Sequence, residues 1–443
     1  MRISSTMMSN NYLKQLNGTY EQYSKLMEQA DGSKLHRASD NAVGYSKYLR
    51  YQNNQISNEQ YQSNVSTAAS WMKNADAALV NVTDLLQTFK AKVEQGSNST
   101  NNESDMKDIA KELLANVQEQ VADLNTQIGD RFLFAGQKDT TMPFEISADK
   151  MNRGDTFTLD EKQSAFFSGA SNWGEENTTL KQMLKLKGDD GNSYYMNVNT
   201  GDVYTEDFVK NGYKNEDKFD PATQAVCNIT SGTAGTAQAY NVSENFDQYG
   251  VIIDNKTGVG TNYSKKITVD GKDVNLTLST TKQYIVKYAG DDKYISMVKK
   301  NGGVDKATDT VNVTGQDING CDLFDVGNDP HSGTARLNQL LYTVAKMDAA
   351  DYKWAGEQGM TIADSAHATV LGAQTKMAAR QQAYKSSSSM LVTQNESITS
   401  DISDVSSTDV AYLATKLMEY QTIYSLSLSV GSKILPGTLA DYL

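Results

Sequence analysis

Proline is nearly absent from this chain of 443 residues, which contains only four. A proline inside a helix removes a backbone donor and clashes with the preceding turn, so a long proline-free stretch is open to long helices. The four prolines bracket a middle block, at Pro143, Pro221, Pro330 and Pro436. Both ends of the chain are therefore free to be long helices, which is more typical of a building block than of a catalyst.

Cysteine and long apolar runs are also scarce. The two cysteines, Cys227 and Cys321, allow one disulfide or two buried thiols, and their spacing does not decide between them. No apolar run is long enough to span a bilayer, and the N-terminus lacks the hydrophobic segment of a cleavable secretory signal. We expect no membrane insertion, and a protein that is cytoplasmic or leaves the cell by a route without such a signal.

Basic residues do not cluster, and the formal net charge is −13 with an isoelectric point near 4.8. An acidic chain without a basic patch is a poor match for nucleic acid, so we expect no nucleic-acid binding. The hydrophobic fraction is 38%, and polar amides and hydroxyls are plentiful. This composition favours elongated helices with narrow apolar seams.

The residue patterns of catalytic and metal sites are missing. None of the motifs of zinc proteases, serine hydrolases or phosphate-binding loops occurs. The acidic turns at 188–191 and 290–292 lack the alternating oxygens and terminal glutamate of a calcium loop. The three histidines are not spaced as metal ligands: His36, His331 and His367. We therefore expect no enzyme, no metal and no cofactor.

Apolar residues recur every three or four positions from Leu13 to Ile128 and from Ala363 to Tyr424, the spacing of one helix face. The inner parts, 41–142 and 331–409, are expected to fold with each other. The C-terminal stripe is half polar, so it is expected to pack against the longer N-terminal seam in an intramolecular helical bundle. Asn54 and Asn58 lie on the phase of that seam, where polar groups set register at some cost in stability. The expected seam residues are Val65, Met72, Leu79, Leu86, Val117, Leu124, Val370, Met377, Leu391 and Ile398.

The outermost segments, 1–40 and 410–443, also carry apolar stripes but have no obvious partner in the same chain. Isolated helices of this length are marginal in water. We expect both to be disordered in the monomer and to fold on assembly with neighbouring subunits. The expected assembly interface consists of Leu13, Leu16, Tyr20, Tyr23, Met27, Val410, Leu413, Leu417, Tyr420 and Tyr424.

The middle block, residues 143–330, changes to short alternating runs separated by glycine turns. Residues 193–205, 267–278 and 284–298 each suggest a hairpin, the second through its Asp-Gly turn. The expected fold is therefore α+β. It combines a long antiparallel coiled-coil bundle, built from N- and C-terminal segments, with an inserted β-rich surface domain.

Several segments resemble the family of flagellins and flagellar hook-associated proteins. Residues 30–50, ADGSKLHRASDNAVGYSKYLR, resemble its N-terminal signature, although the family often has Asp-Asp-Pro where this chain has Asp40-Asn41-Ala42. Residues 131–144, RFLFAGQKDTTMPF, are more specific and are similar to the proteins at the junction of hook and filament. Three more segments are similar to the same proteins: 288–292 (YAGDD), 312–320 (NVTGQDING) and 435–443 (LPGTLADYL).

The resemblance implies a structural subunit of the bacterial flagellum. Such a subunit is exported unfolded through the flagellar type III apparatus. It forms a ring outside the cell that links the hook, via the first hook-associated protein, to the flagellin filament. The resemblance also implies an export chaperone that shields the C-terminal stripe. Two alternatives stay open: a flagellin that forms the filament itself, and an adhesin that presents the β-rich domain on a helical stalk.

Overall fold

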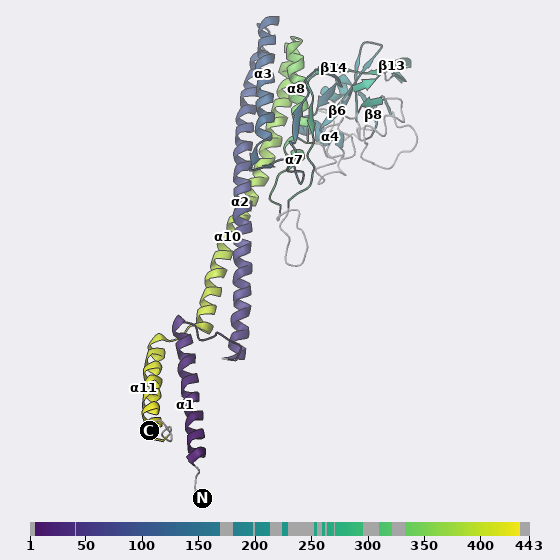
Figure 1. Ribbon diagram of the computed structural model, residues 1–443. Helices are drawn as coiled ribbons and strands as arrows, with labels where there is room; N and C mark the ends of the chain where they lie inside the picture. Colours follow the sequence, from purple (N-terminus) through teal and green to yellow (C-terminus); the bar gives the residue numbers. More distant parts are fainter. Residues whose placement is uncertain are drawn as a thin grey trace. The chain divides into compact units, whose positions relative to one another are not determined.

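A computed structural model describes residues 5–39, 41–168, 180–197, 200–212, 224–228, 252–254, 259–261, 264–269, 271–295, 310–320 and 333–434. Long helices dominate both ends of the chain (Figure 1). The helical elements are α1 (Ser5–Glu28), η1 (Gln29–Asp31), α2 (Ala42–Gly96), α3 (Glu103–Leu124), α4 (Glu161–Ser168), α5 (Glu206–Lys210), α7 (Gly315–Asn319), α8 (Ala335–Asp348), α9 (Tyr352–Trp354), the π-helix η5 (Ala355–Gly359), α10 (Met360–Ser406) and α11 (Val410–Ile434).

The contacts divide the chain into two compact units, residues 1–67 with 385–443 and residues 68–384. In the first unit, the start of α2 packs against the end of α10. The side chain of Asn58 donates to Gln394 Oε1 at 3.3 Å, and Gln62 Nε2 donates to the carbonyl oxygen of Leu391 at 3.3 Å. The partner number falls as the number along α2 rises, so the two helices are antiparallel.

The second unit continues the bundle with the rest of α2, α3, α8 and the start of α10. Asn116 donates to the carbonyl oxygen of Leu85 at 3.0 Å, and Lys92 pairs with Glu112, so α2 and α3 form an antiparallel hairpin. The turn between them ends at Asn102, whose side chain caps α3 in a capping box with Asp105. Such a box satisfies two amide donors that a helix start otherwise leaves unpaired.

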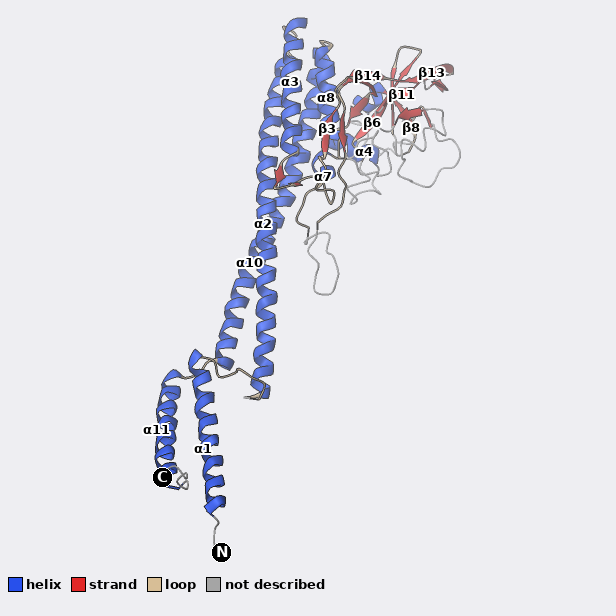
Figure 2. Cartoon of the chain, viewed as in Figure 1, coloured by secondary structure: helices blue, strands red, loops and turns tan. Residues whose placement is uncertain are grey.

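Short strands form the inserted block, where Figure 2 shows them beside α8. They are β1 (Gln127–Ile128), β2 (Arg131–Phe132), β3 (Phe144–Ile146), β4 (Met151–Gly154), β5 (Thr156–Thr158), β6 (Gln182–Gly188), β7 (Ser193–Met196), β8 (Asp202–Thr205), β9 (Cys227–Asn228), β10 (Ile252–Asp254), β11 (Val259–Thr261), β12 (Ser264–Val269), β13 (Lys272–Leu278), β14 (Thr280–Gln283) and β15 (Val286–Tyr288).

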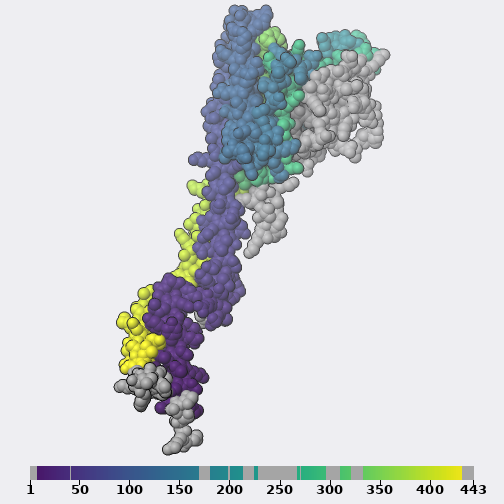
Figure 3. All heavy atoms as spheres, in the orientation of Figure 1, coloured from purple at the N-terminus to yellow at the C-terminus, as the bar shows by residue number. Residues whose placement is uncertain are grey.

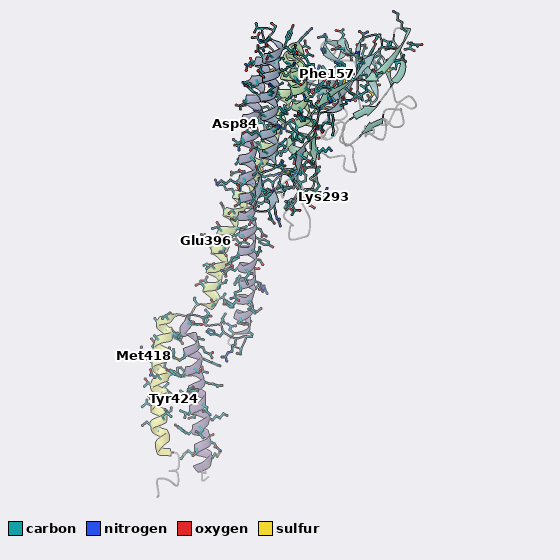
Figure 4. The ribbon with its side chains drawn as sticks, turned by 45° about the horizontal axis from the view of Figure 1, so that its top comes forward. Asp84, Phe157, Lys293, Glu396, Met418 and Tyr424 are labelled. Carbon is teal, nitrogen blue, oxygen red and sulfur yellow. The ribbon has the colours of Figure 1, made fainter. Side chains whose placement is uncertain are left out.

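The largest sheet is antiparallel and runs in the order β12-β13-β6-β7-β8-β9, with β5 also paired to β6. Its buried face is rich in aromatic and aliphatic side chains from β5 to β8, among them Phe157, Leu184 and Tyr204. Phe157 is labelled in Figure 4 and packs at a ring distance of 4.9 Å from Tyr195. This cluster gives the inserted block a hydrophobic core of its own.

Two polar contacts tie the strands to α8. The side chain of Asn338, which is buried, accepts from the amide of Val286 at 2.8 Å and donates to its carbonyl oxygen at 3.3 Å. Lys150 pairs with Asp348 at the other end of α8 at 2.8 Å. The inserted block is thus fastened to the bundle by specific polar contacts as well as by packing.

The expected α+β class, with long terminal helices and an inserted β-rich domain, is confirmed. Two hairpins form as expected, β7 with β8 and β12 with β13. The interpretation of 284–298 as a hairpin is wrong, because β15 pairs with β3, which lies about 140 residues earlier in the sequence. The contact boundary lies inside α2 and α10, whereas the sequence suggested limits at 40 and 410. The disorder of the terminal segments in the monomer stays a prediction.

Candidate assembly interface

The two terminal helices, α1 and α11, lie against each other (Figure 3) and run in opposite directions (Figure 1). Tyr12 donates to the carbonyl oxygen of Ser427 at 2.7 Å, and the rings of Tyr20 and Tyr424 lie 5.7 Å apart. The less exposed positions of each helix recur every three or four residues, which is the spacing of one face. On α1 they are Tyr12, Leu16, Thr19, Tyr23 and Leu26, and on α11 Leu413, Leu417, Tyr420, Tyr424, Ser427 and Gly431.

The structure corrects the expectation that these stripes have no partner in the same chain, because each has the other. The expected interface residues fall into two groups. Six lie at half-buried or buried positions: Leu16, Tyr23, Leu413, Leu417, Tyr420 and Tyr424. Four are more exposed, namely Leu13, Tyr20, Met27 and Val410, although the ring of Tyr20 still contacts that of Tyr424. Figure 4 shows the contrast on α11, where Tyr424 points toward α1 and Met418 points away.

A second set of apolar side chains remains exposed on this helix pair. Met418 is 65% exposed, and no charged residue occurs from 420 to 432 on α11. Exposed apolar clusters of this kind mark interaction surfaces. Besides Met7 and Met8 on α1, the residues are Tyr412, Met418, Ile423, Leu426, Leu428 and Val430 on α11. The sequence interpretation missed these residues because it followed only one apolar stripe on each helix. The near absence of charged residues in α11 was a signal that this helix carries two apolar stripes.

The ten expected seam residues of the bundle are all buried. Met72, Leu79, Val117, Leu124, Val370 and Met377 have no measurable exposure, whereas Leu391 and Ile398 retain 9% and 8%. Asn58 is buried at 3%, but Asn54 on the same predicted phase is exposed. The seam is therefore more polar and less tightly covered in the first unit than in the second.

Three of the segments that resemble junction proteins meet at one place in the second unit. The loop at 288–292 inserts beside the segment at 131–137, which contains β2 and the turn after it. Asp291 donates its amide to the carbonyl oxygen of Ala135 at 3.0 Å, and its carboxylate accepts the amide of Gln137 at 2.6 Å. Tyr288 donates to the carbonyl oxygen of Phe134 at 2.9 Å. A Cβ on Gly136 would overlap Asp291, which explains why a glycine occupies position 136 in this segment.

The segment at 312–320 closes the cluster. Thr314 caps α7 in a capping box with Asp317 and also donates to Asp292 at 2.7 Å. The phenol of Tyr294 donates to the Asp317 carboxylate at 3.0 Å. Burial first, and then that carboxylate, raise the pKa of Tyr294. Each of these motifs is weak when taken alone in the sequence. In the structure they form one contact cluster between the 131–137 segment, the 288–292 loop and α7.

A buried arginine lies beside this contact cluster. Arg336 at the start of α8 is 2% exposed and donates to Asn319 at 2.8 Å and to Gln120 at 2.5 Å. Burial lowers its pKa to about 9. Through its two amide partners, Arg336 connects α8 to α7 and to α3. We therefore interpret the side chain as a structural contact between helices and not as a reactive group.

The described part of the chain offers little for catalysis or cofactor binding. No group of three or more potential ligands is placed to hold a metal there. One small cavity of about 10 Å³ lies between β4 and α8 and holds no more than a water. A larger open hollow of about 550 Å³ is lined mainly by polar side chains of β7 and α5. His331 and Cys321 lie outside the described residues.

Among the helices described, none combines the length and the apolar character needed to cross a membrane.

Residues 3–139 match the model of the bacterial flagellin N-terminal helical region. The chain is 26% identical over 302 residues to a flagellin of Salmonella moscow, covering 60% of this chain and 58% of that protein. It is 27% identical over 305 residues to a flagellin of Salmonella berta, with the same coverage. The chain thus spans less than two thirds of the length of these relatives.

Solved structures with a similar course of the chain include two flagellar proteins. One is a putative flagellar hook-associated protein from Vibrio parahaemolyticus, with a TM-score of 0.40, 14% identity, and coverage of 83% of this chain and 100% of that one. The other is the flagellar junction protein FlgL from Legionella pneumophila, with a TM-score of 0.33, 11% identity, and coverage of 76% and 98%. By sequence, residues 3–139 of this chain are similar to the flagellin N-terminal helical region, and the similarity to whole flagellins extends over 60% of the chain.

Proposed function

We propose that this chain is a structural subunit of the bacterial flagellum, and not an enzyme. The observation that carries the proposal is the flagellin N-terminal region at residues 3–139, together with the apolar surface left exposed on α1 and α11. A monomer gains nothing from exposing Met418 or Leu426 to water, whereas burial against another subunit removes that apolar area from solvent. The partner of this surface is a second copy or a related flagellar subunit.

Within the flagellum, we propose the role of the third hook-associated protein, the junction between hook and filament. The support is the contact cluster formed by the 131–137 segment, the 288–292 loop and α7. Three segments that separately resemble junction proteins contact one another through Asp291, Tyr288 and Thr314. A shared contact network is a stronger argument than three independent short matches, because its residues depend on one another.

The junction role sets partners and location. The subunit forms a ring outside the cell, with the first hook-associated protein on one side and flagellin on the other. It reaches that place unfolded through the flagellar type III apparatus, with a chaperone on its C-terminal stripe before export. Within the terminal segments 1–40 and 410–443, α1 and α11 are then the assembly helices. These two helices are disordered in the free protein, whereas the linker residues next to the bundle are folded in it. Residues 41–142 with 331–409 form the bundle domain, and 143–330 form the surface domain.

A filament end assay tests the proposal. Purified chain is mixed with isolated hooks that carry the first hook-associated protein, and separately with sheared flagellin filaments as seeds. The junction role predicts binding to the hook end in a limited number of copies, and flagellin growth from the capped end only afterwards. Absence of binding to either end contradicts a flagellar role.

A flagellin that builds the filament itself is the second candidate, and its support is the similarity to the Salmonella flagellins. It predicts long polymers of this chain alone on filament seeds, an outcome that excludes the junction role. A stalked adhesin, in contrast, needs terminal helices that are ordered in the monomer. Strong amide protection throughout 5–31 and 410–434 in the free protein supports the adhesin and counts against assembly helices.

A further inference from the structure

The two linkers that lead to the terminal helices are joined to each other. Ser33, in the linker from α1 to α2, faces Ser407, in the linker from α10 to α11, in an isolated antiparallel bridge. The amide of Lys34 donates to the carbonyl oxygen of Ser406 at 2.7 Å, and the amide of Thr408 donates to that of Gly32 at 3.0 Å. Both bonds are between backbone groups, so the bridge depends on the path of the chain and tolerates many side chains.

Each strand of the bridge is braced by its own surroundings. Gly32, at φ +93°, closes the turn after η1 with its amide on Gln29. The Asp31 carboxylate accepts the amide of Ser33 at 2.9 Å, and Leu35 is 5% exposed. On the other side, Ser406 is 9% exposed and donates to the carbonyl oxygen of Ile402 at 2.6 Å. The bridge is therefore part of a small folded node and not a passing contact between loops.

We propose that these linkers form one joint, which keeps α1 and α11 in fixed register and makes them move as a pair during assembly. The inference rests on the proposed function, since it concerns how the assembly helices are controlled. A single linker leaves its helix free to rotate and slide. Two linkers held together at Ser33 and Ser407 act as the turn of a hairpin does, fixing which residues of the following elements face each other.

The contacts between the two helices follow one another outward from the joint. Moving away from it, Tyr20 meets Tyr424, and farther on Tyr12 meets Ser427 and Gly431. Each step along α1 is matched by a step along α11 in the opposite direction. A shift of one residue along α11 turns its contact face by about 100°, which moves Gly431 off Tyr12.

A disulfide across the bridge tests the joint. The two hydrogen bonds flank Ser33 and Ser407, which makes them a non-hydrogen-bonded antiparallel pair, with Cα atoms typically about 4.5 Å apart. That spacing is within the range of a disulfide. The variant is Ser33→Cys with Ser407→Cys in full-length protein that also carries Cys227→Ser and Cys321→Ser. The matched control is Ser33→Cys with Ser400→Cys in the same background. Ser400 lies two helical turns back along α10, about 10 Å from Ser407.

The joint predicts near-complete intramolecular cross-linking of the 33/407 pair in dilute monomer, and at least tenfold slower cross-linking of the 33/400 pair. It also predicts that the oxidised protein binds hook or filament ends within twofold of its reduced form. Equal cross-linking of the two pairs overturns the joint. So does a tenfold loss of end binding that returns on reduction, because the bridge must then open during assembly.

Failure of the proposed function gives a different result. If the reduced protein, and the parent without new cysteines, bind neither hook nor filament ends, the flagellar role fails whatever the cross-linking shows. The cross-linking rates still decide the joint in that case, because they are measured on the monomer.

Discussion

The ring of Tyr12 on α1 occupies the space beside Gly431 on α11, where the Cβ of any larger residue would overlap the phenol. The same phenol donates to the carbonyl oxygen of Ser427 one turn earlier. Glycine at 431 thus lets the two terminal helices approach closely, and Tyr12 fixes their offset. The contact lies at the far end of the pair from the Ser33–Ser407 bridge, so the two together define the register at both ends.

Substitution Gly431→Ala is expected to weaken the α1–α11 pair by about 1–3 kcal/mol, the usual effect of overpacking. Amide exchange of α1, read in the free protein and in the assembly, measures the loss. The matched control is Gly18→Ala on α1, where nothing lies within 4 Å of the new Cβ. The control is expected to stabilise α1 by about 1 kcal/mol through helix propensity alone. Equal protection in the two variants contradicts a role for the Tyr12–Gly431 contact.

The contact cluster around Asp291 is expected to be destabilised by the substitution Gly136→Ala. Gly136 has φ +72°, and its Cβ would overlap both the carbonyl and the carboxylate of Asp291. Gly129, in the nearby turn between β1 and β2, has φ +65° but open space around it. Gly129→Ala therefore isolates the backbone term of about 1–2 kcal/mol, and Gly136→Ala is expected to lower the free energy of unfolding by roughly twice as much because of the added overlap. Thermal unfolding of the two variants, compared with the parent, measures the difference.

The helical part of this fold is readable from the sequence because its information is local. A seam residue such as Leu79 is buried by its spacing from neighbours on the same helix, whatever helix covers it. The turn at Asp270-Gly271 likewise defines a hairpin within a dozen residues. The α+β class follows from the change between these two kinds of pattern.

Long-range partners are not readable in the same way. The alternation in 286–288 predicts a strand but does not say that β3 is its neighbour. Ser33 and Ser407 carry no pattern at all, because their bridge is made by backbone groups that every residue has. The pairing of α1 with α11 was missed for a related reason: an apolar stripe shows that a partner exists, and not whether the partner is in the same chain.

The buried amide of Asn58 is expected to give register at the expense of stability. It donates to Gln394 and accepts from Gln62 at 2.7 Å. Asn58→Leu is expected to raise the free energy of unfolding by about 1 kcal/mol, since apolar burial replaces a weak polar contact. It is also expected to promote self-association through the now apolar seam, as measured by sedimentation. Asn54→Leu, at an exposed position, is expected to change neither. Lower stability of Asn58→Leu contradicts this view of the seam.

Stability is expected to fall as the pH rises above about 10, the ordinary pKa of tyrosine. Burial raises the pKa of Tyr195, Tyr294 and Tyr342 above that value. The folded protein therefore keeps three protons that the unfolded chain releases, and each contributes a loss of about 1.4 kcal/mol per pH unit between its unfolded and folded pKa. Arg336 acts in the opposite sense: its pKa of about 9 in the folded protein means that stability rises with pH from 9 toward its ordinary value. Three phenols outweigh one guanidinium, so the net change above pH 10 is a loss.

Tyr342→Phe tests the tyrosine contribution directly. Removing one buried phenol is expected to reduce the slope of unfolding free energy against pH above pH 10 by about 1.4 kcal/mol per unit. Tyr352→Phe, whose side chain is 47% exposed, is the control and is expected to leave the slope unchanged. Urea unfolding at pH 8 to 11 gives the slopes of both variants and the parent. An identical slope for Tyr342→Phe and the parent means that the folded protein releases the Tyr342 proton as readily as the unfolded chain does. Burial then does not hold that proton, and the alkaline transition has another origin.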